Sequence, residues 1–139
     1  MTYLGIDIGS TCAKSVIMNK ERGILDTFVI PTGWSSLEAL KEIKEKLRIK
    51  GYNFEDMYCI STGYGRQAVE GAKKRVTEIT CHAKGASVLF GEDTFNIVDI
   101  GGQDTKVISC HKGKVMEFYM NDKCSAGTGK FLEIMANRL

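Results

Sequence analysis

Apolar and polar residues follow two different spacings along the chain. Short runs rich in β-branched and aromatic residues predict strands, whereas apolar residues at every third or fourth position predict amphipathic helices. The runs predict strands at 3–8, 13–19, 24–30, 57–61, 94–100, 106–110 and 114–120. The helical spacing predicts helices at about 36–50, 80–90 and 127–139, with one or two further turns at 64–71.

The order of these elements indicates the class of fold. Short turns join neighbouring strands near the start and near the end of the chain, whereas helices separate the other strands. Hairpins pair strands antiparallel, and helical crossovers pair them parallel. We therefore expect an α/β fold, in which a mixed sheet is flanked by helices.

Composition and charge exclude several classes of protein. The 139 residues carry 19 Lys and Arg against 17 Asp and Glu, and this balance gives no reason to expect a nucleic-acid partner. The longest uninterrupted apolar run, Met57–Ile60, is far shorter than the ~20 residues that cross a membrane. The first residues lack the basic region and apolar stretch of a signal peptide, so we expect a cytoplasmic protein.

The chain has five cysteines, none of them in a C-x-x-C pair. That spacing excludes zinc ribbons and thioredoxin-like redox motifs, and it favours free thiols or metal ligands in a reducing compartment. Cys124 precedes a predicted helix, where a thiolate is stabilised by the helix dipole, but on spacing alone a partly exposed structural thiol is the favoured explanation. We expect the other four to behave as small core residues, at Cys12, Cys59, Cys81 and Cys110.

One pattern occurs twice, about ninety residues apart. Asp7-Ile-Gly and Asp99-Ile-Gly each end a buried strand, and each is followed by four residues and a lysine, Lys14 or Lys106. For either copy alone, a turn whose Asp accepts backbone hydrogen bonds is an adequate explanation. Two copies on two hairpins favour a common chemical role.

The residue types at these two loops suit phosphate and Mg²⁺. Glycine turns expose backbone N–H groups to anionic oxygens, hydroxyl and ammonium groups add donors, and carboxylates hold hydrated Mg²⁺. The sequence therefore predicts a nucleotide-phosphate site. The residues expected to contact the nucleotide are Gly9, Ser10, Thr11, Lys14, Gly101, Gly102 and Gln103, and those expected to hold Mg²⁺ through water are Asp7 and Asp99.

Two further polar positions have alternative explanations. Gln103 and Asp104 follow the second glycine turn, where they are candidates to position a water for attack on the γ-phosphate. A polar turn that satisfies its own hydrogen bonds is the simpler alternative. His82 lies four residues after Glu78, which fits a helical pair with a structural role, and the spacing of the histidines argues against zinc.

These segments also resemble a known family. Asp7–Lys14 and Asp99–Lys106 resemble the first and second phosphate motifs of the actin, heat-shock chaperone and sugar-kinase ATPase superfamily. Within it, the stretches 77–86 and 121–133 resemble the activator, or component A, of 2-hydroxyacyl-CoA dehydratases. The related ATPase subunits of benzoyl-CoA reductase, in the BadF/BadG/BcrA/BcrD family, are similar too.

The resemblance implies a cofactor and partners that the residue spacing does not establish. It implies a homodimer that binds ATP or ADP and shares one [4Fe–4S] cluster, with Cys124 as one of two thiolate ligands from each subunit. ATP hydrolysis would drive the transfer of one low-potential electron to a dehydratase or reductase component. A ferredoxin or flavodoxin would supply that electron.

The resemblance also implies how the chain is organised. We expect a ribonuclease-H-like, actin-type ATPase domain over 1–120 that carries both phosphate loops. Residues 121–139 would form the cluster-ligand loop and the start of an inter-domain helix, with the second domain and the second cluster ligand missing. Two alternatives remain: a sugar or acetate-type kinase domain, which has no cluster, and a non-catalytic nucleotide-binding fragment.

Overall fold

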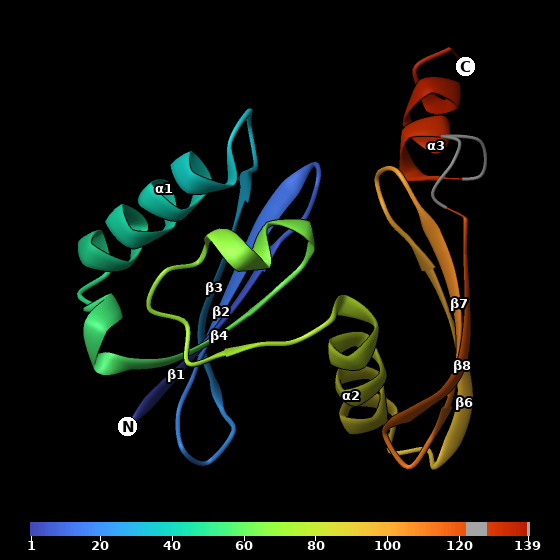
Figure 1. Cartoon of the computed structure of the whole chain (residues 1–139), viewed down its shortest axis with the longest axis horizontal. Helices are drawn as coiled ribbons and strands as arrows, with labels where there is room; N and C mark the ends of the chain where they lie inside the picture. Colours follow the sequence, from blue (N-terminus) through green and yellow to red (C-terminus); the bar gives the residue numbers. More distant parts are fainter. Residues whose placement is uncertain (122–127, 139) are drawn as a thin grey trace. The chain divides into compact units, whose positions relative to one another are not determined.

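The computed structural model describes residues 1–121 and 128–138. The chain forms two compact units, one from Met1 to Glu78 and the other from Ile79 onward. Figure 1 labels their helices and strands. Each unit contains its own sheet and its own hydrophobic core, so we describe the two units separately. Among the described residues, no helix is long and apolar enough to span a membrane.

The first unit is built on a five-stranded mixed sheet. Its strand order is β3-β2-β1-β4-β5, with β1 antiparallel to β2 and parallel to β4. This arrangement confirms the predicted mixed α/β fold. The strands are β1 (Thr2–Ile8), β2 (Cys12–Met18), β3 (Ile24–Pro31), β4 (Met57–Thr62) and β5 (Lys74–Arg75), and the helices are α1 (Ser36–Ile49), η1 (Phe54–Asp56) and η2 (Tyr64–Ala68).

Helix α1 covers one face of this sheet (Figure 1). Its start is fixed by Ser35, whose hydroxyl accepts a hydrogen bond from the backbone N–H of Leu37, as N-cap residues commonly do. Ile43 and Leu47 are fully buried against the sheet, and each such side chain stabilises the fold by about 1.5–3 kcal/mol. Leu37, in the first turn of α1, is 54% exposed.

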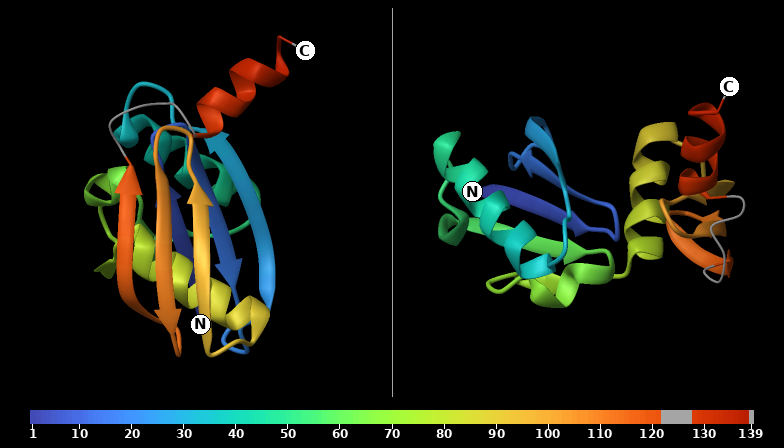
Figure 2. Two further views of the ribbon diagram at one scale, coloured as in Figure 1. Left: turned by 90° about the vertical axis from the view of Figure 1, so that its right-hand side faces the viewer. Right: turned by 90° about the horizontal axis from the view of Figure 1, so that it is seen from above.

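The second unit is an antiparallel three-stranded sheet covered on one face by a helix (Figure 2). Its strand order is β6-β7-β8, so β6 is an edge strand. Ala83 of the helix packs on Ile108 and Cys110 in a small core. The elements are α2 (Glu78–Phe90), β6 (Thr94–Ile100), β7 (Thr105–His111), β8 (Lys114–Asn121) and α3 (Gly129–Ala136).

The two sheets repeat one hairpin in the same register. Asp7 lies opposite Lys14 across β1 and β2, and Asp99 lies opposite Lys106 across β6 and β7. The first phosphate loop therefore belongs to the first unit and the second loop to the second unit. The expected division of the chain at residue 120 stays a prediction.

Candidate functional site

The first loop is a tight hairpin held from several directions. The N–H of Gly9 donates to the carbonyl of Cys12 at 3.0 Å, which closes the turn between β1 and β2. Thr32, at the end of β3, donates its hydroxyl to the carbonyl of Gly9 at 2.7 Å and its N–H to the carbonyl of Thr11 at 3.0 Å. Ser10 and Thr11 remain exposed at the tip, where their hydroxyl groups are accessible to a phosphate.

The charged pair of this loop is accessible on one side. The ammonium of Lys14 lies 2.9 Å from Oδ2 of Asp7, and the lysine side chain is 50% exposed. The other oxygen of Asp7, Oδ1, is buried and has no hydrogen-bond partner among the described residues. A buried carboxylate oxygen without a donor is costly, and the carboxylate and hydroxyl oxygens of this loop are the ligand type that hydrated Mg²⁺ prefers. The residues of the first loop therefore fit a hydrated Mg²⁺.

A glycine outside the two repeated motifs lies against this carboxylate. Gly63, between β4 and η2, has a φ of +84°. A Cβ at this position would collide with Oδ1 of Asp7 and with the carbonyl of Ile8. The glycine-rich turn around Gly63 was the available signal, but its closeness to Asp7 depends on the parallel pairing of β1 with β4.

The second loop closes in the same way as the first. The N–H of Gly101 donates to the carbonyl of Asp104 at 2.8 Å. Gln103 is exposed at the tip, whereas the Asp104 side chain is buried. The structure thus separates the two residues expected to position water: Gln103 is accessible to solvent, and Asp104 faces the interior of the hairpin.

The lysine of the second loop differs sharply from its counterpart. The side chain of Lys106 is only 3% exposed, and its ammonium lies 2.8 Å from Oδ2 of Asp104 and 3.5 Å from Oδ2 of Asp99. Two carboxylates therefore share one buried ammonium.

Helix α2 brings a histidine to the same carboxylate. The Nδ1 atom of His82 lies 2.9 Å from Oδ2 of Asp99. This hydrogen bond lowers the pKa of Asp99; partial burial opposes the shift, and Lys106 adds to it. The helical spacing predicts a structural role for His82 beside Glu78, and no local pattern indicates a contact with a residue 17 positions away.

The start of α3 is tied to the second loop. The N–H of Gly129 donates to the carbonyl of Gly101 at 2.7 Å, and the N–H of Lys130 donates to the carbonyl of Gly102 at 3.2 Å. These bonds occupy two N–H groups of the first helical turn, which have no partner inside the helix. The residue expected to bind the cluster, Cys124, lies outside the described residues.

The other cysteines differ in burial. Cys59 and Cys110 are buried, as expected of core residues, and burial raises the pKa of Cys59 to about 11. Burial also raises the pKa of Cys110. Cys12 and Cys81 are only half-buried, so the expectation of a core position is met in full by two of the four.

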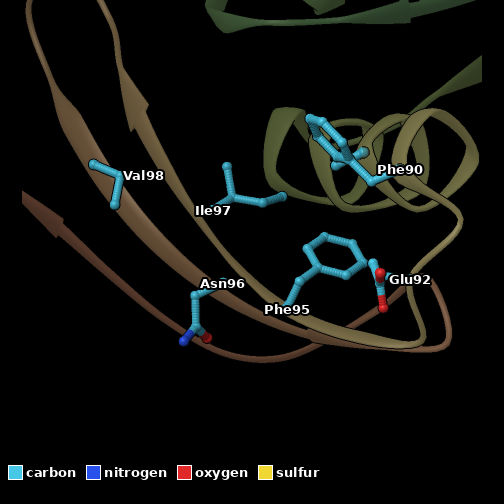
Figure 3. Close-up of a pocket in the computed structure, with 7 residues that line it drawn as sticks. Phe90, Glu92, Phe95, Asn96, Ile97 and Val98 are labelled. Atoms are coloured by element: carbon cyan, nitrogen blue, oxygen red, sulfur yellow. The ribbon is translucent and has the colours of Figure 1, made fainter.

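A pocket elsewhere in the second unit does not suit phosphate. It has a volume of about 450 Å³ and lies between the end of α2 and β6, where Phe95 and Ile97 point toward Phe90 (Figure 3). Its lining residues are Ala86, Phe90, Glu92, Phe95, Asn96, Ile97 and Val98. Because the only charge among them is negative, the pocket is separate in character from the phosphate loops.

Comparison with known proteins identifies relatives along the whole chain. The (R)-2-hydroxyglutaryl-CoA dehydratase activating ATPase of Acidaminococcus fermentans is 43% identical over 138 residues, which cover 98% of this chain and 53% of the relative. The crystal structure of component A of that dehydratase matches with a TM-score of 0.87 and 42% identity, over 99% of this chain and 53% of that one. The chain therefore spans about half the length of these relatives.

A second solved structure is equally similar in fold. The activator of the 2-hydroxyisocaproyl-CoA dehydratase from Clostridium difficile, solved with bound ADPNP, has a TM-score of 0.87 and 38% identity, over 99% of this chain and 52% of that one. The BadF/BadG/BcrA/BcrD ATPase family matches residues 4–139. This match confirms the family resemblance expected from the stretches 77–86 and 121–133, and the chain belongs to the BadF/BadG/BcrA/BcrD ATPase family.

Proposed function

We propose that this chain is the nucleotide-binding part of an ATP-dependent activator of a 2-hydroxyacyl-CoA dehydratase or of a related CoA-ester reductase. The observation that carries the proposal is the pair of Asp-Ile-Gly hairpins in one register. Support comes from relatives that are named as dehydratase activators and from the ADPNP bound to one of them. Activators of this kind contact a protein component, so we propose a dehydratase or reductase as the partner.

We assign the phosphate chemistry to the residues of the two loops. Lys14 and the exposed hydroxyls of Ser10 and Thr11 would bind the phosphates, together with the N–H groups of the glycine turns. Asp7 and Asp99 would hold Mg²⁺ through its bound water. Gln103 would orient the attacking water, and Asp104 would keep the loop that carries Gln103 closed.

We further propose that the activator carries a [4Fe–4S] cluster with Cys124 as one ligand. When bound, such a cluster supplies one low-potential electron for the partner component. A ferredoxin or flavodoxin would then reduce the cluster again. A [4Fe–4S] cluster takes four thiolates, and a two-fold axis lets two identical subunits supply two each. The proposal therefore requires a homodimer and a second ligand in addition to Cys124.

Iron content under anaerobic conditions tests the cluster assignment. In a form of the protein extended to the length of its relatives, we expect a brown dimer with four irons, whereas the 139-residue chain should be colourless. Cys124→Ser should abolish iron binding in the extended form. The matched variant Cys110→Ser, at a buried core position, should lower only stability, by roughly 1–3 kcal/mol. Four irons retained in the Cys124→Ser dimer would disprove the assignment.

A further inference from the structure

The two matching hairpins differ in how their lysines are used. Lys14 is half exposed and contacts one carboxylate, Asp7. Lys106 is almost fully buried and lies between Asp99 and Asp104. A buried ammonium held by two carboxylates has no route to a phosphate in solution. Lys106 is therefore suited to fixing the second loop and not to binding the nucleotide.

The polar contacts of Asp99 fall on one of its two oxygens. Among the described residues, Nδ1 of His82 and the ammonium of Lys106 both approach Oδ2, at 2.9 and 3.5 Å. An ionised carboxylate only accepts hydrogen bonds, so Nδ1 of His82 is the donor. These two contacts lie on the same oxygen, so they restrict rotation of the carboxylate and leave Oδ1 for another partner.

The histidine is itself held by the core of the second unit. Ala83, the next residue of α2, is fully buried against Ile108 and Cys110. Because α2 is anchored at this point, His82 approaches the end of β6 from a fixed backbone position. The His82 side chain is 34% exposed and the Asp99 side chain 19%, so both lie at the border between the core and solvent.

We propose that His82 is a positioning residue for Asp99: it holds Oδ2 together with Lys106, so that Oδ1 stays oriented toward Mg²⁺-bound water when Mg²⁺ and nucleotide bind. The inference rests on the Mg²⁺ role proposed above for Asp99. Residues that orient metal-binding groups in this way typically change metal affinity by about 10–100-fold when they are replaced.

The first test measures the contact without metal or nucleotide. The chain has two histidines, so the imidazole nitrogen resonances of the 139-residue chain can be assigned by NMR with the variant His111→Leu. We expect His82 to carry its proton on Nδ1, and we expect Asp99→Leu to shift that resonance and leave His111 unchanged. A His82 resonance that does not respond to Asp99→Leu would overturn the inference.

The second test measures ATP affinity in the extended form, in Mg²⁺ and in EDTA. His82→Leu should weaken Mg²⁺-dependent binding about tenfold or more and change binding in EDTA less than twofold. His82→Asn, whose amide places a donor near the position of Nδ1, should restore most of the loss. His111→Leu removes a histidine that bonds Thr94 at the other end of β6, and it should behave as wild type.

The outcomes separate this inference from the proposed function. Suppose that wild type binds ATP more tightly in Mg²⁺ than in EDTA. If His82→Leu then loses the same ATP affinity in both conditions, or loses none, only the positioning role is overturned. If wild type gains nothing from Mg²⁺, the metal role of Asp99 and this inference both fail. If Lys14→Ala leaves ATP affinity unchanged, the assignment of the first loop is contradicted. The positioning role is then still tested by the His82 variants.

Discussion

Lys14 and Lys106 occupy equivalent positions in two hairpins, yet only the first is accessible to a ligand. The difference comes from their neighbours. Lys14 contacts one carboxylate at the border with solvent, whereas Lys106 compensates two carboxylates from a buried position. Single-residue substitutions can separate these roles, because the two lysines contact different carboxylates.

We expect Lys14→Ala and Asp7→Asn each to slow ATP hydrolysis tens- to hundreds-fold in the extended form. The reason is that a lost charged contact to phosphate or to Mg²⁺-bound water costs about 2–4 kcal/mol in the transition state. The matched control is Lys50→Ala, which removes another partly exposed lysine–aspartate pair, with Asp26 at 2.7 Å. Near-normal turnover in both loop variants would contradict the assignment of the first loop.

Burial of Cys59 gives a prediction about alkaline pH. Its pKa is raised from 9.0 to about 11, mainly because the buried site disfavours a thiolate. The folded state therefore keeps a proton that the unfolded chain releases, and stability present below pH 9 is lost as the pH rises toward 11. Two pKa units correspond to a free energy on the order of 2–3 kcal/mol.

Urea unfolding at several pH values between 8 and 11 measures this loss. The free energy of unfolding should fall less steeply with pH in Cys59→Ala than in wild type. Cys12→Ala, a half-buried cysteine of the same sheet, controls for the removal of a thiol. Parallel pH profiles for wild type and Cys59→Ala would show that the thiol does not titrate as expected.

At the scale of elements, the connection between β4 and η2 matters to the first loop. Gly63 has a positive φ and leaves no space for a side chain next to Asp7 and Ile8. Gly51, after α1, has a similar φ of +83° but open space around its Cβ position. Comparing substitutions at the two glycines therefore distinguishes the cost of backbone strain from the cost of steric contact with the site.

Gly51→Ala should destabilise the chain by about 1–2 kcal/mol, the cost of a left-handed backbone for a residue with a Cβ. Gly63→Ala should cost more, because Asp7 and the carbonyl of Ile8 must move, and it should also weaken ATP binding in the extended form. Denaturant unfolding and nucleotide titration measure the two effects. If both variants lose the same stability and neither loses affinity, then Gly63 does not shape the site.

Sequence patterns were informative wherever a property depends on neighbouring residues. Runs of β-branched and aromatic residues and glycine turns located the hairpins, and the repeated Asp-Ile-Gly located the two loops that the structure places in one register. The contact between His82 and Asp99 was not predictable, because it depends on how α2 packs over β6. The same holds for Gly63, which meets Asp7 through the pairing of distant strands.

At the scale of the whole molecule, the two loops follow strands in different settings. Strand β1 lies in the middle of its sheet, between β2 and β4, whereas β6 lies at the edge of a three-stranded sheet and pairs with β7. A strand with one antiparallel partner forms backbone hydrogen bonds to that partner at only every second residue. Within 1–121 and 128–138, the backbone that leads into the first loop is therefore hydrogen-bonded to strands on both sides, and the backbone that leads into the second loop to a strand on one side.

This difference should appear in amide hydrogen exchange, which reports the free energy of local opening. We expect amides along β1 to be protected without interruption, and those along β6 to alternate between slow and fast exchange. Continuous protection along β6, equal to that of β1, would contradict this expectation. The consequence is that two loops sharing the Asp-Ile-Gly motif differ in rigidity. The loop bearing Asp99 opens at lower cost, so nucleotide binding would order it more than the loop bearing Asp7.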